Sequence, residues 1–154
     1  MSTSEDVVKL NESFKVICDD LYGLNYVCKI KLYPGFGNAG RSLEEIVSES
    51  IGDTVKIGGS SSITTLEAIE DISAALNFRG DESSHPDLYF LDSQDFSVQS
   101  KKILRLAGQL LSSSNNLIQF WLKSGHPFYP VFWDFAFISE CKNDALVWIG
   151  SSSD

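Results

Sequence analysis

Two apolar runs in the last third of the chain constrain its fold most strongly. The run PVFWDFAFIS covers residues 130–139 and the run ALVWIG covers residues 145–150, with the polar sequence ECKND between them. Aromatic and β-branched runs that flank a short polar turn are typical of a β-hairpin. The first run is apolar at odd and at even positions, which predicts a central strand covered on both faces. An aromatic surface left open for a partner is the alternative.

Asp134 is the one acidic residue inside the first of these runs. On a strand, Trp133 and Phe135 would point to one face and Asp134 to the other. A buried carboxylate must accept hydrogen bonds or become protonated. We therefore expect Asp134 to be held by structural hydrogen bonds, and an acid–base role in catalysis is the alternative.

Helical and strand-like patterns alternate along the rest of the chain. Apolar residues spaced for one helix face predict helices at residues 4–22, 64–76 and 97–112, and Ser42 and Gly52 bound a shorter helix. In the second of these helices, Leu66, Ile69, Ile72 and Leu76 form the expected buried stripe. Strands are expected at residues 25–33, 54–57 and 87–92, and the three SSS triplets are expected in loops and caps. Residues 117–123 alternate like a strand, and a helix that ends at Gly125 is the alternative. This order predicts a single α+β domain over residues 1–154, with three to four helices on a mainly antiparallel sheet that ends in the hairpin.

The segment PGFGNAGRS, residues 34–42, has the glycine spacing of a dinucleotide-binding turn. Such a turn follows a fully apolar strand, and an acidic residue stands roughly 20 residues later. Lys29 and Lys31 interrupt the strand, and residues 58–62 contain no acid. We therefore predict a strand-to-helix loop that ends at the capping residue Ser42, with Phe36 either packed in the core or offered to a partner.

The charge distribution favours some partners over others. The net charge is −9, and residues 42–71 hold seven acidic residues against Lys56 alone. Without clusters of Lys and Arg, binding to nucleic acid or to an anionic membrane is disfavoured. A basic protein partner is compatible with the acidic segment, in which Glu44 and Glu45 are candidate binding residues.

Cysteine and histidine spacing argues against covalent crosslinks and metal sites. Cys18, Cys28 and Cys141 are odd in number and far apart, which favours a reducing cytoplasm over a disulfide framework. Residues 1–20 lack the pattern of a signal peptide, and no apolar run is long enough to span a membrane. His85 and His126 have no ligand residue at metal-binding spacing, so no metal or cofactor is expected.

The leading functional hypothesis is therefore a non-enzymatic, cytoplasmic protein-binding module. In composition it resembles small acidic inhibitor or immunity proteins that neutralise a partner protein. The alternative is a small ligand- or phosphate-binding enzyme that uses the Gly-rich loop 34–42, with His126 and Asp134 as acid–base groups; a homo-oligomer is also possible. No catalytic residue is assigned, and the candidate binding residues are Phe36, Glu44, Glu45, His126, Tyr129, Trp133 and Asp134.

Overall fold

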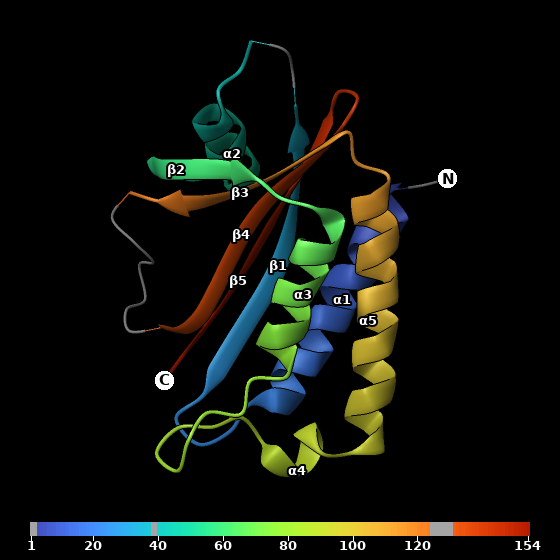
Figure 1. The fold of residues 1–154 in the computed structure, drawn as a ribbon, viewed down its shortest axis with the longest axis vertical. Coiled ribbons are helices and arrows are strands. Elements are labelled where there is room, and N and C mark those ends of the chain that lie inside the picture. The colour runs from blue at the N-terminus through green and yellow to red at the C-terminus, as the bar shows by residue number, and fades with distance from the viewer. Residues whose placement is uncertain (1–2, 38–39, 124–130) are drawn as a thin grey trace.

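The predicted hairpin forms the centre of a five-stranded antiparallel sheet (Figure 1). The computed structural model describes residues 3–37, 40–123 and 131–154. Strands β4 (Val131–Cys141) and β5 (Asp144–Ser153) are joined by a turn in which Lys142 has φ 58°. The sheet order is β1-β5-β4-β3-β2, with β1 (Val27–Phe36) at one edge and β3 (Asn116–Leu122) and β2 (Ile57–Ser62) on the other side. The prediction of an α+β fold with a C-terminal hairpin is confirmed.

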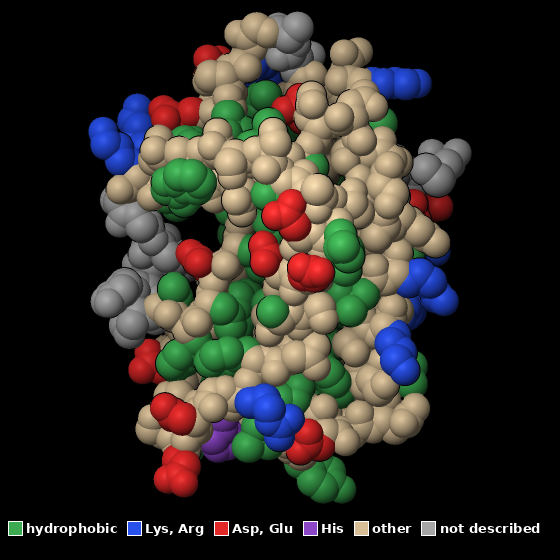
Figure 2. Space-filling view, in the orientation of Figure 1, with side chains coloured by type: hydrophobic (Ala, Val, Ile, Leu, Met, Phe, Trp, Pro, Cys, Tyr) green, Lys and Arg blue, Asp and Glu red, His purple; other side chains and the backbone are tan. Residues whose placement is uncertain are grey.

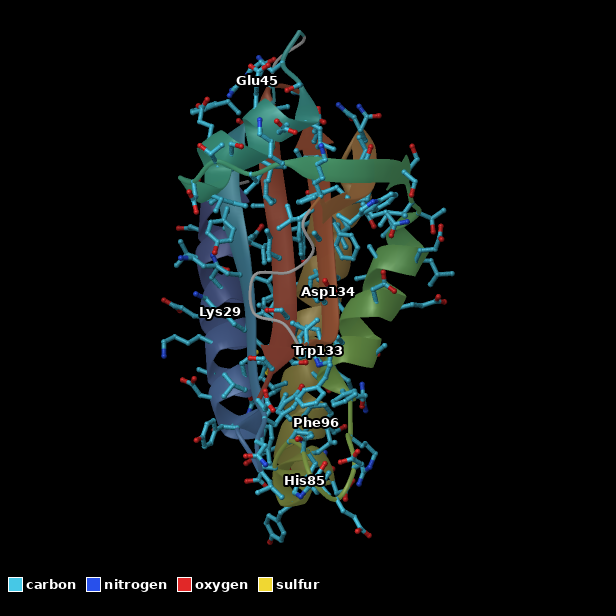
Figure 3. All side chains as sticks on the ribbon, turned by 90° about the vertical axis from the view of Figure 1, so that its left-hand side faces the viewer. Lys29, Glu45, His85, Phe96, Trp133 and Asp134 are labelled. Atoms are coloured by element: carbon cyan, nitrogen blue, oxygen red, sulfur yellow. The ribbon has the colours of Figure 1, made fainter. Side chains whose placement is uncertain are left out.

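Helices cover the sheet unevenly (Figures 1 and 3). Helices α1 (Thr3–Leu21), α3 (Thr65–Leu76) and α5 (Gln94–Ser112) lie on one face, and the short α4 (Leu88–Leu91) precedes α5. Helix α2 (Leu43–Ile51) lies on the opposite face near one end of the sheet. Of the helices in the described part of the chain, none covers the lower part of that face.

Two hydrophobic clusters correspond to the two faces. Neighbouring residues of a strand point in opposite directions, so Trp148 packs in the cluster under α1, α3 and α5, while Val147 packs in the cluster under α2. In β4, Phe137 likewise packs in the cluster under α1, α3 and α5, and Ile138 packs in the cluster under α2. The predicted burial of this strand on both faces is confirmed along this stretch. The expected stripe of α1 is also buried: Val7, Leu10, Phe14, Ile17 and Leu21.

Asp134 lies beyond the part of the sheet that α2 covers. Its side chain is exposed, so the expectation of a buried carboxylate is wrong. The pattern of the strand places Asp134 on the face opposite Trp133 and Phe135, as expected, but sequence cannot reveal where a covering helix stops.

Several local predictions also need correction. Residues 88–91 form a helical turn instead of a strand, because the Asp87 carboxylate accepts a hydrogen bond from the Phe90 amide and caps it. Strand β2 is Ile57–Ser62, so its serines pair with β3, and the last SSS triplet lies in β5. Pairing with the neighbouring strand overrides the weak β-propensity of glycine and serine here. Leu66, expected in the buried stripe of α3, is exposed.

Side chains from helices occupy the free edges of both edge strands. The Asn11 amide of α1 donates to the Leu32 carbonyl (3.0 Å) and accepts from the Leu32 N–H (2.8 Å) on β1. The Glu44 carboxylate of α2 accepts from the Ile57 N–H of β2 (3.0 Å). Unpaired edge groups invite pairing with another chain, so these contacts protect the sheet at one position on each edge.

A candidate site where two strands diverge

A cavity opens where β3 separates from β4. The two strands pair only between residues 116–119 and 137–140; beyond these, β3 continues along β2 and β4 continues along β5. The cavity between them has a volume of about 510 Å³, within the range of small-molecule sites. Figure 2 shows the surface hollowed between the elements that Figure 1 labels β3 and β4.

The lower wall of the cavity is polar. The sheet register places Lys29 of β1, Ser151 of β5 and Asp134 of β4 side by side on the face that α2 leaves open. All three line the cavity. Figure 3 shows Lys29 and Asp134 on different strands, with β5 between them.

The next row of the sheet and the segment after α2 supply apolar surface. Ile149 of β5 and Ala136 of β4 form the floor, and Ile51 and Val55 lie above them. Lys31 of β1 completes this row, and its Nζ atom lies 5.0 Å from the centre of the Tyr33 ring. The cavity is thus apolar inside, with ammonium groups along its β1 side.

The gap between the strands also admits residues from the helix-covered side. Asp71 of α3 and Gln119 and Trp121 of β3 line the cavity there. The Trp121 indole lies against the backbone of Gly59 on β2, where any Cβ would collide with the ring. The absence of a side chain at Gly59 therefore leaves the space that the Trp121 ring occupies, and Trp121 remains 53% exposed.

In the part of the chain that the structure describes, no salt bridge neutralises the carboxylates of the cavity. Partial loss of hydration at the wall of the cavity, followed by the negative charges of Glu67 and Glu70, raises the pKa of the largely exposed Asp71 above its ordinary value. Within residues 3–37, 40–123 and 131–154, the salt bridges join Lys15 to Asp19, Arg41 to Glu49, Lys56 to Glu44 and Arg79 to Asp92. None of them involves the cavity residues Lys29, Lys31, Asp53, Asp71 or Asp134.

The candidate residues from the sequence are not gathered in one place. Asp134 lines the cavity, while Trp133, its neighbour on β4, donates from Nε1 to the Tyr26 hydroxyl (2.9 Å) on the helix-covered side. Phe36 is 63% exposed at the end of β1. His126 and Tyr129 lie outside the described residues, and so does any pairing of His126 with Asp134.

Glu44 and Glu45 lie on α2 and make contacts within the chain. The bond from the Ile57 N–H, followed by Lys56, lowers the pKa of Glu44. Glu45 is the N3 residue of the helix, and its N–H donates to the capping Ser42 hydroxyl (3.1 Å). Glu44 thus has a structural role at the edge of β2, and its role in binding stays a prediction.

The Gly-rich segment differs from the expected loop. Residues 34–36 continue β1 and pair with residues 144–146 of β5. Ser50 of α2 lies so close to Gly35 that a side chain there would collide with it. The Arg41 guanidinium donates to the Phe36 carbonyl (3.2 Å) and pairs with Glu49. Arg41 therefore makes contacts within the chain, and a role in binding an anion stays a prediction.

The one histidine that the structure describes, His85, forms an isolated antiparallel β-bridge with Leu24. One ring nitrogen of His85, Nδ1, lies 2.7 Å from the Pro86 carbonyl, and the His85 N–H donates to the Leu24 carbonyl. Among the described residues, no group of His, Cys, Asp and Glu side chains could hold a metal ion.

Sequence reasoning missed Trp121, Asp71 and the two lysines as neighbours in a single cavity. Gly58 and Gly59 carried a usable signal, because paired glycines in a strand mark a place where another group approaches the backbone. The sequence contains no signal for the gap between β3 and β4, since this gap depends on which strands pair.

No helix within the described part of the chain is long and apolar enough to cross a membrane. In comparisons with known proteins, no family model, no curated protein and no solved structure matches this chain.

Proposed function

We propose that the chain is a non-enzymatic protein-binding module that docks a basic partner. The observation that carries the proposal is the acidic surface of α3, defined as Glu67, Glu70 and Asp71. These residues lie within about one helical turn, and all three are exposed. Figure 2 shows acidic side chains gathered in the middle of this face of the molecule.

The electrostatics of α3 support a cationic partner. Mutual repulsion contributes to the raised pKa of Asp71, so a nearby cation would relieve an unfavourable arrangement. On α2, by contrast, Lys56 and Arg41 already neutralise Glu44 and Glu49. Complementary charge speeds encounter and selects partners. The sequence alone suggests α2 as the docking surface. The charge contacts described above favour α3 instead.

Exposed apolar side chains next to the acidic surface could supply affinity. Leu66, four residues before Glu70 on α3, is 67% exposed. Trp121 lines the same cavity as Asp71 and is held against Gly59. Tryptophan is enriched among the residues that dominate binding energy. Leu66 and Trp121 are thus the proposed anchors beside the charged surface.

An inhibitor or immunity-type role, in which binding neutralises the partner, is the biological form we propose for this docking. A cytoplasmic location belongs to the same proposal and is supported by the odd number of cysteines and by the free thiols of Cys18, Cys28 and Cys141.

The proposal can be tested by affinity purification from the organism that encodes the chain. The wild type is compared with Glu67→Lys/Glu70→Lys, and with Glu12→Lys/Asp20→Lys on α1 as a control with the same change in charge. We expect one basic protein to be recovered by the wild type and the control but lost with the α3 variant. Equal recovery with all three proteins, or no basic protein recovered by the wild type, would count against the proposal.

A further inference from the structure

The cavity at the β3–β4 divergence carries opposite charges on opposite sides. Lys29 and Lys31 stand on β1, whereas Asp134 stands on β4 and Asp71 on α3. Strand β5 separates the two sides, as Figure 3 shows for Lys29 and Asp134. The cavity shares Asp71 and Trp121 with the proposed docking surface and its anchors. The other charged residues of the cavity are not part of that surface.

The spacing of the strands keeps these charges apart. Adjacent strands lie about 4.8 Å from each other, so the backbones of β1 and β4 are roughly 10 Å apart. Among the described residues, neither lysine forms a salt bridge with a cavity carboxylate. As far as the structure describes the chain, both ends of the cavity therefore carry charges without an ion-pair partner, an arrangement that suits a ligand with its own separated charges.

The surface between the charged ends is apolar, and the acidic end is also aromatic. Ile149 and Ala136 lie between Lys31 and the acidic side, in the same row of the sheet as Lys31. The Trp121 indole, held over Gly59, lines the cavity together with Asp71. A planar cation gains from an aromatic face and from carboxylates at the same time.

We propose that this cavity binds a free basic amino acid of the arginine type. The α-carboxylate lies toward Lys29 and Lys31, the alkyl chain crosses the apolar floor, and the guanidinium lies between Asp134, Asp71 and Trp121. Asp53, which also lines the cavity, is the carboxylate left for the α-ammonium group. The carboxylates of Asp53, Asp71 and Asp134 would repel a purely anionic ligand. The two lysine ammonium groups would repel a purely cationic one.

Calorimetric titration of the full chain with three small molecules tests this assignment. L-arginine has both ends, agmatine lacks the α-carboxylate, and L-citrulline lacks the cationic side chain. We expect L-arginine to bind and the other two to bind at least about tenfold more weakly. No binding of L-arginine at millimolar concentration, or equal binding of the three compounds, would overturn the proposal.

Matched variants identify which wall recognises which end of the ligand. Lys29→Gln/Lys31→Gln should weaken L-arginine about tenfold and bind agmatine at least as well as the wild type, because the repelling ammonium groups are gone, whereas Asp134→Asn should weaken both. Asp144→Asn, at the exposed turn of the hairpin, is the control and should bind like the wild type. Lys29, Lys31, Asp134 and Asp144 are all exposed, so the variants should fold, which circular dichroism would verify. Equal loss of both ligands in the lysine variant would contradict the proposed orientation.

Discussion

Replacing Asn11 by Ala should destabilise the fold through the free edge of β1. The Asn11 amide makes two hydrogen bonds with the backbone of Leu32, at 2.8 and 3.0 Å, and both are partly buried. Each such bond contributes about 1 kcal/mol, and a backbone group left without a partner costs more. Because water can reach part of this edge, we expect the free energy of unfolding to fall by roughly 2–3 kcal/mol.

Urea and thermal unfolding followed by circular dichroism measure this effect. For a chain of this length, the expected loss corresponds to a decrease in Tm of roughly 5–10 °C. Glu12→Ala, one residue along α1 and exposed, is the matched control and should change stability by less than about 0.5 kcal/mol. If Asn11→Ala is no less stable than this control, the edge of β1 does not depend on the Asn11 contact. An exposed edge should also increase aggregation of the Asn11 variant.

Three further predictions concern packing, thiol reactivity and pH. Gly59→Ala should displace the Trp121 indole, which lowers the unfolding midpoint and changes tryptophan emission. Gly108→Ala is the control: a Cβ at Gly108 would have Ile69 Cδ1 as its nearest contact, at 4.0 Å, so this variant should be neutral or stabilising. In the native protein, exposed Cys141 should react with a thiol reagent promptly and Cys18 only slowly, because a hydrogen bond with Cys28 and burial raise the pKa of Cys18; prompt reaction of all three thiols before denaturation would refute this. Glu44 has a lowered pKa in the folded state, so its stabilising effect is present above the unfolded carboxyl pKa and is lost as the pH falls through the folded value. Glu44→Gln should therefore lower the urea midpoint at neutral pH and approach the wild type near pH ~3; a difference that does not depend on pH would contradict the charge effect.

Hydrophobic periodicity predicted those helices and strands in which the pattern within the element alone determines which residues are buried. The stripe of α1 and the alternation in β1 require only local geometry, and both are observed. The capping box at Thr64 and Glu67 is present with both of its bonds, because caps depend on neighbours in sequence. These features could be read without knowing the sheet order.

Features that depend on tertiary pairing could not be predicted. Strand β2 consists of glycine and serine apart from Ile57 and forms because β3 lies beside it. Asp134 is exposed because α2 stops short of it, and Leu66 is exposed because none of the described elements covers that side of α3. The cavity requires β3 and β4 to separate, and this depends on the lengths over which each pairs with its other neighbour.

The acidic surface of α3 is tested most directly by the salt dependence of partner binding. The dissociation constant of a purified basic partner, captured by the wild type, would be measured at increasing ionic strength for the wild type and for Glu67→Lys/Glu70→Lys. We predict that the affinity of the wild type falls as salt screens the charges, and that the variant binds far more weakly at low salt. An affinity that is independent of salt and equal in the two proteins would contradict the proposed docking surface.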